Sequence, residues 1–163
     1  MIRVYSYHKL IILFFVFIVQ LFAPRIYVLE TSMSIDVFLI YLTYLSTHNN
    51  RTLLVFLGFS FGLAQDIITQ YELLGLFALT KTATGFILGS LNNYNKIWSK
   101  NIKMAILFLT YLFHFTLSSY LMFDRFVTPM SYIFQISLIQ STWTFLILYI
   151  INRFILIDNK VVE

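Results

Sequence analysis

The sequence predicts an all-α, polytopic membrane protein with six transmembrane helices, the second of them short. Hydrophobic residues make up 60% of the 163 residues and charged residues only 11%, a balance that does not suit a water-exposed surface. Six apolar runs alternate with short polar segments, and the positive residues gather in alternate segments, as in multi-pass membrane proteins. We therefore expect one transmembrane helical domain over residues 1–163 and no soluble domain.

The first expected helix, residues 10–23, follows a basic N-terminus. This outline is also that of a signal peptide. However, Leu21 and Ala23 make a poor small-x-small cleavage site, and Pro24 would follow the cleaved bond. A retained helix is therefore favoured.

The second expected helix is the weakest. It follows an exit loop with Pro24, Arg25 and Glu30, and its apolar run, residues 35–45, extends over roughly 16 Å of helix. A bilayer core is about 30 Å thick, so this helix spans only if it is extended to residues 31–47. The other four runs have ordinary spanning lengths: 53–68, 73–91, 102–122 and 131–151.

The charge bias orients the helices. Six spans with the N-terminus inside place eight positive residues in the cytoplasm and two outside, with Lys81 in the bilayer. Five spans with the N-terminus inside reverse this bias. Five spans with the N-terminus outside place seven positive residues in the cytoplasm and three outside. Only the basic flank of the first helix then favours the six-span topology over this one. We expect both termini in the cytoplasm. The eight inner residues are Arg3, Lys9, Arg51, Lys96, Lys100, Lys103, Arg153 and Lys160.

Glycines mark a central hairpin, because all five in the chain lie between residues 58 and 89. In an antiparallel pair, positions 58 and 89, 62 and 85, and 66 and 81 share one constant sum, which places them at equal depth. This predicts glycine-to-glycine helix packing. The residues spaced by four on the two faces are Gly58, Gly62 and Asp66, and Lys81, Gly85 and Gly89.

The same register predicts an ion pair between Asp66 and Lys81 inside the membrane. A charge within a bilayer costs about 2.5–3.5 kcal/mol, so each needs a partner or an exit to water. Alternatively, Asp66 lies in the outer headgroup region and Lys81 snorkels. The constant sum implies that the hairpin turns at position 73.5, but the polar centre of the loop lies nearer position 70.5. The register of the two helices could therefore slip by about a turn.

Polar stripes predict the interface of the last two helices. When the two helices run antiparallel, the residue numbers of facing polar positions total 255, 255 and 254. These sums centre the pair on the turn at residues 127–128. Interhelical hydrogen bonds of this kind orient helices. We interpret His114 as a hydrogen-bonded packing residue, with a proton carrier or ligand as the alternative. The stripes are Thr110, His114 and Ser118, and Ser137, Gln140, Ser141 and Thr144.

Motifs for enzyme chemistry are weak. Residues 58–62 match G-x-S-x-G, but a nucleophile elbow needs a strand-to-helix turn, and this match lies within an apolar segment. The chain has no cysteine, no metal-ligand motif, no phosphate-binding loop and no nucleic-acid motif. We therefore expect no enzyme activity, cofactor or metal. An acidic site at the outer face is the alternative that stays open, formed by Asp36, Asp66, Glu72 and Asp124.

The hairpin also carries a family resemblance. The run GFSFGLAQD, which ends at Asp66, is followed by Leu74 and Gly75, and then by Leu79, Gly85 and Gly89. This order of features resembles the rod shape-determining protein MreD family. In that family a helix with two glycines and a leucine ends in aspartate, a short loop follows, and a leucine-glycine opens the next helix. The length and the number of apolar segments agree. Asp36 resembles a family proline-aspartate, with Ile35 at the proline position, and Lys81 departs from the family pattern.

The resemblance implies a cytoplasmic-membrane scaffold of the bacterial cell-elongation machinery, which builds peptidoglycan and sets cell shape. Such a protein binds MreC, and thereby connects MreB filaments to the polymerase RodA and its partner transpeptidase, without catalysis. The family also resembles the substrate-binding subunits of energy-coupling-factor transporters, so a vitamin-binding subunit is the alternative function. That subunit carries an alanine-xxx-alanine surface on its first helix, where this chain has Ala23 alone.

Overall fold

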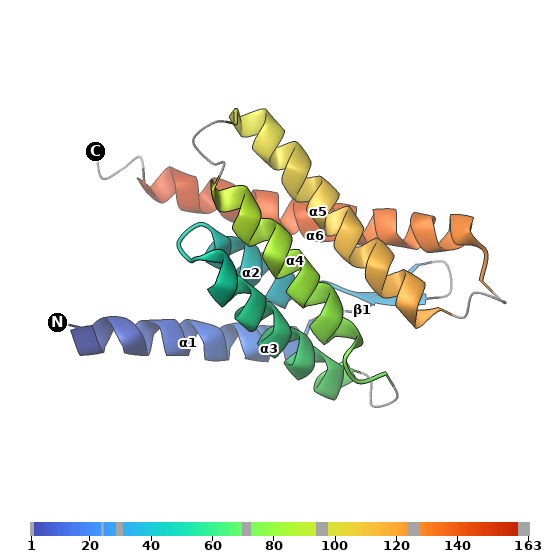
Figure 1. Cartoon of the computed structure of the whole chain (residues 1–163), viewed down its shortest axis with the longest axis horizontal. Coiled ribbons are helices and arrows are strands. Elements are labelled where there is room, and N and C mark those ends of the chain that lie inside the picture. Colours follow the sequence, from blue (N-terminus) through green and yellow to red (C-terminus); the bar gives the residue numbers. More distant parts are fainter. Residues whose placement is uncertain are drawn as a thin grey trace.

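The structure, a computed structural model, contains six helices and a two-stranded sheet in the residues that it describes. It describes the backbone of 2–23, 25–28, 31–69, 73–93, 98–123 and 128–159, and the side chains of 11–23, 34–69, 73–91, 98–99, 101–123 and 128–152. The elements are α1 (Ile2–Leu21), β1 (Arg25–Val28), β2 (Thr31–Ser34), α2 (Val37–Ser46), α3 (Arg51–Thr69), α4 (Leu76–Asn93), α5 (Lys100–Met122) and α6 (Met130–Asn159). Successive helices run in alternating directions, so α1 begins and α6 ends at the same end of the molecule (Figure 1).

The helical content agrees with the predicted fold class, including the short second helix. Within the residues whose side chains the structure describes, three helices are long and apolar enough to cross a membrane: Arg51–Thr69, Asn101–Met122 and Met130–Asn152. The other apolar stretches of these residues are shorter: Ile11–Leu21, which is the described part of α1, Val37–Ser46 and Leu76–Leu91.

The segment predicted as an exit loop contains an antiparallel hairpin instead. Arg25 of β1 pairs with Ser34 of β2, and Val28 pairs with Thr31. Pro24 and Glu30, which were part of the same prediction, lie outside the described residues. The hairpin carries the chain from α1 to the start of α2.

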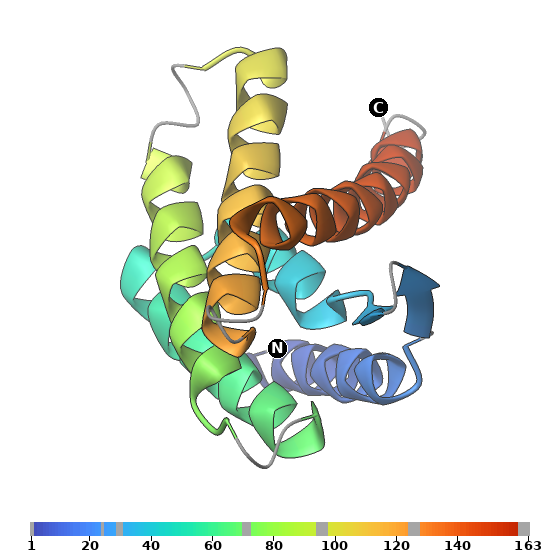
Figure 2. The same cartoon turned by 90° about the vertical axis from the view of Figure 1, so that its right-hand side faces the viewer.

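Helix α2 lies at the centre of the molecule, between α1 on one side and α5 and α6 on the other (Figure 2). Phe38 stacks on Phe61 of α3, with ring centroids 5.4 Å apart, and Leu39 packs with Tyr111 and Phe115 of α5. The ten residues of α2 extend over roughly 15 Å. Other helices surround α2 and bury most of its side chains, so it does not have to reach both faces of a bilayer.

Helices α3 and α4 touch through their backbones. A Cβ atom on Gly62 would collide with the backbone of Ala78 and the carbonyl oxygen of Phe77. One on Gly85 would lie 2.5 Å from the carbonyl oxygen of Leu54. Gly58 and Gly89 likewise face Lys81 and Arg51. The predicted close packing is therefore confirmed.

The glycine-to-glycine register is wrong, however. Gly62 faces Ala78, seven residues before the predicted partner Gly85. The facing positions total about 140, which centres the hairpin near residue 70. The centre therefore moves from position 73.5 to about 70, which is the direction and about the one-turn slip that the polar loop indicated. Glycine makes room for any backbone, so each glycine packs against ordinary residues of the partner helix.

The register of α5 and α6 is as predicted. The ring of Phe145 contacts Phe108, with centroids 5.4 Å apart, and Tyr111, at 6.1 Å. These positions total 253 and 256 and bracket the predicted sums of 254 and 255.

Candidate functional site at the centre of the bundle

Asp36 begins the site, because it caps the N-terminus of α2. Its Oδ1 accepts a hydrogen bond from the backbone N–H of Leu39 at 2.9 Å. Gln20 of α1 completes the cap, since its Oε1 accepts from the N–H groups of Val37 and Phe38 at 2.7 and 3.4 Å. The first N–H groups of a helix have no partner within the helix, so these side chains supply acceptors inside the protein. The second carboxylate oxygen of Asp36 remains available to other helices.

Lys81 of α4 binds that second oxygen. Its Nζ donates to Asp36 Oδ2, and both side chains are almost completely buried. The same ammonium lies 5.3 Å from the centre of the Phe77 ring, which attracts it through a cation–π interaction. The carboxylate and the ammonium neutralise each other where neither reaches water, which is the condition that a buried charge requires.

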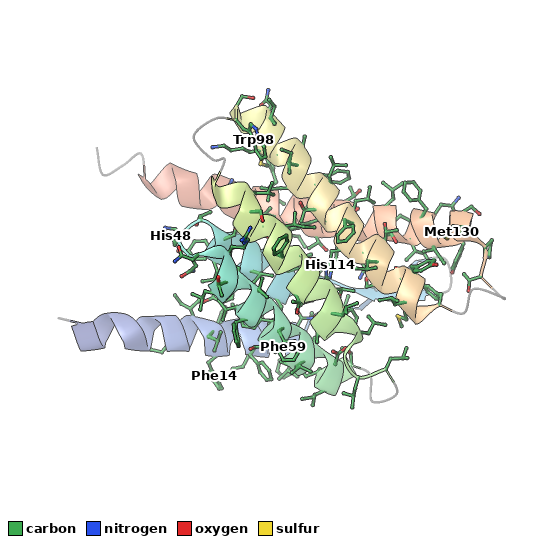
Figure 3. The ribbon with its side chains drawn as sticks, viewed as in Figure 1. Phe14, His48, Phe59, Trp98, His114 and Met130 are labelled. Carbon is green, nitrogen blue, oxygen red and sulfur yellow. The ribbon has the colours of Figure 1, made fainter. Side chains whose placement is uncertain are left out.

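His114 of α5 is the third member, and Figure 3 shows it within the bundle. Its Nε2 lies 3.4 Å from Asp36 Oδ2, and its Nδ1 lies 3.0 Å from Thr84 Oγ1. Thr84 donates its only hydroxyl hydrogen to the carbonyl of Thr80 at 2.7 Å, so Nδ1–H is the donor towards Thr84. In a neutral ring Nε2 then carries a lone pair towards the carboxylate, which agrees with its having no hydrogen-bond partner among the described residues.

The chemistry open to this cluster is limited by burial. A proton taken up at His114 Nε2 would turn its contact with Asp36 into an ion pair and compete with Lys81. The three side chains are not among those that line the cavity between α2, α4, α5 and α6 or the cavity on α6. The described residues also contain no group of three histidine, cysteine or acidic side chains placed to hold a metal ion. The cluster joins α2, α4 and α5.

Asp66 has a different role from the one predicted. Its carboxylate accepts from the backbone N–H groups of Gly75, Phe77 and Ala78 at 3.1, 2.9 and 3.0 Å. The predicted Asp66–Lys81 pair is therefore wrong. The shifted register places Asp66 beside the first turn of α4, where unpaired N–H groups and the positive end of the helix dipole bind an anion. Lys81 does not snorkel either, because it is fully buried.

The polar stripes of α5 and α6 are buried, except for the half-buried Gln140, but they do not bond to each other as predicted. Among the described residues, His114 bonds to Thr84 and lies beside Asp36, Gln140 donates to Ser34 O at 3.3 Å, and Thr144 Oγ1 has no partner. The others donate to carbonyls of their own helices: Thr110, Ser118, Ser137 and Ser141. Crowded, rigid helices leave these short hydroxyls closer to their own carbonyls than to the neighbouring helix. The prediction of a hydrogen-bonded His114 is confirmed.

Sequence reasoning missed the partner of Lys81. The only available signal was an aspartate directly before an apolar run, which indicates a helix cap but not the lysine 45 residues later. The alternative acidic site at the outer face is not formed by Asp36 and Asp66, which bind separate groups. Glu72 and Asp124 lie outside the described residues.

Comparison with known proteins adds no relative to this geometry. No protein-family model, curated protein or solved structure matches the chain.

Proposed function

We propose that the chain is a non-catalytic membrane scaffold of the bacterial cell-elongation machinery, with six spans, both termini in the cytoplasm and MreC as its direct partner. One observation supports this most. The helical glycines and the aspartate of the MreD-like motif join α3 to α4: the glycines admit the partner backbone, and Asp66 binds the first turn of α4. A motif built for helix assembly suits a scaffold.

The distribution of side chains supports a membrane location. The buried centre contains an ion pair, a histidine and several hydroxyls, whereas large apolar side chains lie on the outside. Phe14 of α1, 67% exposed, projects away from the other helices in Figure 3. Phe56 of α3 is 68% exposed. Exposed apolar surface on this scale is what lipid or a partner helix covers.

The alternative, a vitamin-binding subunit, receives less support. Such a subunit needs a ligand pocket towards the outside. A cavity of about 220 Å³ lies where α2 ends and α5 begins, which is the cytoplasmic end in the proposed topology and not the side where such a ligand would bind.

Co-purification tests the proposal. The tagged chain is extracted from its native host in mild detergent, and the co-purifying proteins are identified by mass spectrometry. We expect MreC and, through it, MreB, RodA and its partner transpeptidase. Recovery of an ATPase module together with a bound vitamin would instead establish the transporter subunit.

Surface variants then locate the partner. Exposed apolar side chains are changed to alanine helix by helix, and recovery of MreC and the melting temperature are both measured. We expect one group to abolish MreC recovery without lowering the melting temperature. Thr84→Val is the matched buried control, expected to lower stability and keep MreC. Loss of MreC only in destabilised variants would contradict a surface-binding scaffold. The groups are Phe14 and Phe22, Phe56 and Phe59, and Leu109 and Phe113.

A further inference from the structure

A cavity of about 220 Å³ lies at one end of the bundle, apart from the Asp36 cluster. It opens between the C-terminal ends of α2 and α4, the start of α5 and the later part of α6. This volume equals that of about seven water molecules at liquid density, which is enough for a small polar headgroup. The described residues bring four helices together here without filling the space between them.

The rim of the cavity is polar and carries a positive charge. Lys103 of α5 and Asn152 of α6 supply N–H donors. Ser46 and Thr47 also line it, and each hydroxyl donates its hydrogen to a carbonyl of α2. The Ser46 oxygen is left as an acceptor, whereas the Thr47 oxygen also contacts His48 Nδ1 and keeps one lone pair. The described acidic side chains, Asp36 and Asp66, bind elsewhere and form no ion pair with Lys103.

The inner wall of the cavity is apolar. Leu88 and Leu91 of α4 and Leu107 of α5 line it, and Leu107 lies one turn further along α5 than Lys103. The cavity therefore offers a cation and hydrogen-bonding groups at its outer edge and a hydrocarbon surface behind them. A wholly polar ligand would leave that surface against water or polar groups, whereas an amphiphile satisfies both parts.

We propose that this cavity binds an anionic glycerophospholipid whose headgroup carries hydroxyls. Its phosphate lies against Lys103 and Asn152, its headgroup hydroxyls donate to the oxygens of Ser46 and Thr47, and its first acyl methylenes follow the leucine wall. Basic pockets between helices on the cytoplasmic side of a membrane bind acidic lipid headgroups. Among the described residues, Arg51 at the start of α3 lies at this same end as Lys103. The inference rests on the membrane location proposed above and does not need MreC.

Tryptophan fluorescence provides the test, because the chain has only two tryptophans and Trp98 lines the cavity. Trp143→Phe leaves Trp98 as the only reporter. The purified full chain is reconstituted in phosphatidylcholine vesicles and titrated with phosphatidylglycerol that carries brominated acyl chains, which quench nearby tryptophan. We expect saturable quenching at least about fivefold stronger than with brominated phosphatidylethanolamine. Equal quenching by the two lipids overturns the proposal.

Three variants and a competitor sharpen the result. Lys103→Gln is expected to reduce the preference about fivefold, and Leu107→Phe, which narrows the cavity and keeps the charge, to abolish it. Arg51→Gln removes a positive charge from the same end but not from the cavity, and should keep the preference. Equal losses for Lys103→Gln and Arg51→Gln would show general attraction to a basic surface and overturn the site.

Relief of quenching by free glycerol phosphate would show a soluble phosphate ester as the occupant, contrary to the proposal. MreC recovery is scored separately, so either proposal can fail alone.

Discussion

Two regions of the molecule each bury an aspartate that caps a helix, but they neutralise its charge differently. Asp66 is bound by three backbone N–H groups that lie 9–12 residues later in the same helical hairpin. Asp36 is bound by one local N–H group and by Lys81 45 residues later, and the ring of His114 from a third helix lies beside it. The first charge is satisfied by local backbone, and the second by tertiary assembly.

This difference has consequences for folding and for mutation. The Asp66 site is complete once α3 and α4 pair, whereas the Asp36 site also needs α2 and α5 in place. Backbone donors cannot be deleted by changing a side chain, but the cation of the Asp36 site can be deleted. We therefore expect the Asp36 region to be the more sensitive to substitution.

The largest effect is expected from Lys81→Met, which leaves Asp36 buried without a cation. Removing one partner of a buried ion pair costs about 3–5 kcal/mol. In the double variant Asp36→Asn/Lys81→Met no charge remains, and asparagine still caps α2, so most of this loss should be recovered. The free energy of unfolding, measured by reversible denaturation in detergent micelles, checks both values.

Asp66→Asn is the matched control for this cycle. Because Asp66 is not the partner of Lys81, its loss should add to that of Lys81→Met. A strong coupling between Asp66 and Lys81, together with additive losses for Asp36 and Lys81, would reverse the assignment of the ion pair.

A smaller effect, about 1–3 kcal/mol, is expected from Gly62→Ala in the other region. The new Cβ would collide with the backbone of Ala78 and Phe77, whose N–H groups bind Asp66. Pushing α4 away therefore also weakens the cap, and the loss should be smaller in an Asp66→Asn background. Ser60→Ala, on the exposed side of α3, is the control and should change stability by less than about 0.5 kcal/mol. If Gly62→Ala lowers the free energy of unfolding equally in the wild-type and the Asp66→Asn backgrounds, the glycine contact does not support the Asp66 cap.

Much of this fold could be predicted from local patterns. Apolar runs gave the six helices, glycines spaced by four gave the close contact of α3 and α4, and the turn before Pro129 fixed the register of α5 and α6. The hairpin of β1 and β2 had no such pattern, because its eight residues lack a clear alternation of polar and apolar side chains.

The site could not be predicted, for two physical reasons. Equal-sum pairing assumes that similar residues face each other, but a glycine accommodates whichever backbone lies opposite, as Ala78 does for Gly62. An aspartate also binds either a lysine or the free N–H groups at a helix start, and the sequence does not say which lies nearer. The two positions that departed from the MreD-like pattern, Asp36 with its Ile35 and Lys81, contact each other. That pairing spans 45 residues and left no local signal.

The smallest expected effect concerns Thr84, which links His114 to the Asp36 region. Thr84→Val keeps the shape of the side chain but removes the acceptor for His114 Nδ1, and should cost about 1 kcal/mol.

Thr82→Val is the matched control, because Thr82 lies on the same helix, donates to the Ala78 carbonyl of that helix and has no described partner on another helix. The stability loss in Thr82→Val should be below about 0.5 kcal/mol, because this change removes only a bond within α4. The ring nitrogen signals of His114, followed by NMR in ¹⁵N-histidine-labelled protein, should move only in the Thr84 variant. Equal losses and an unmoved His114 signal would mean that the histidine adds nothing to the Asp36 region, and the contrast with Asp66 would then rest on Lys81 alone.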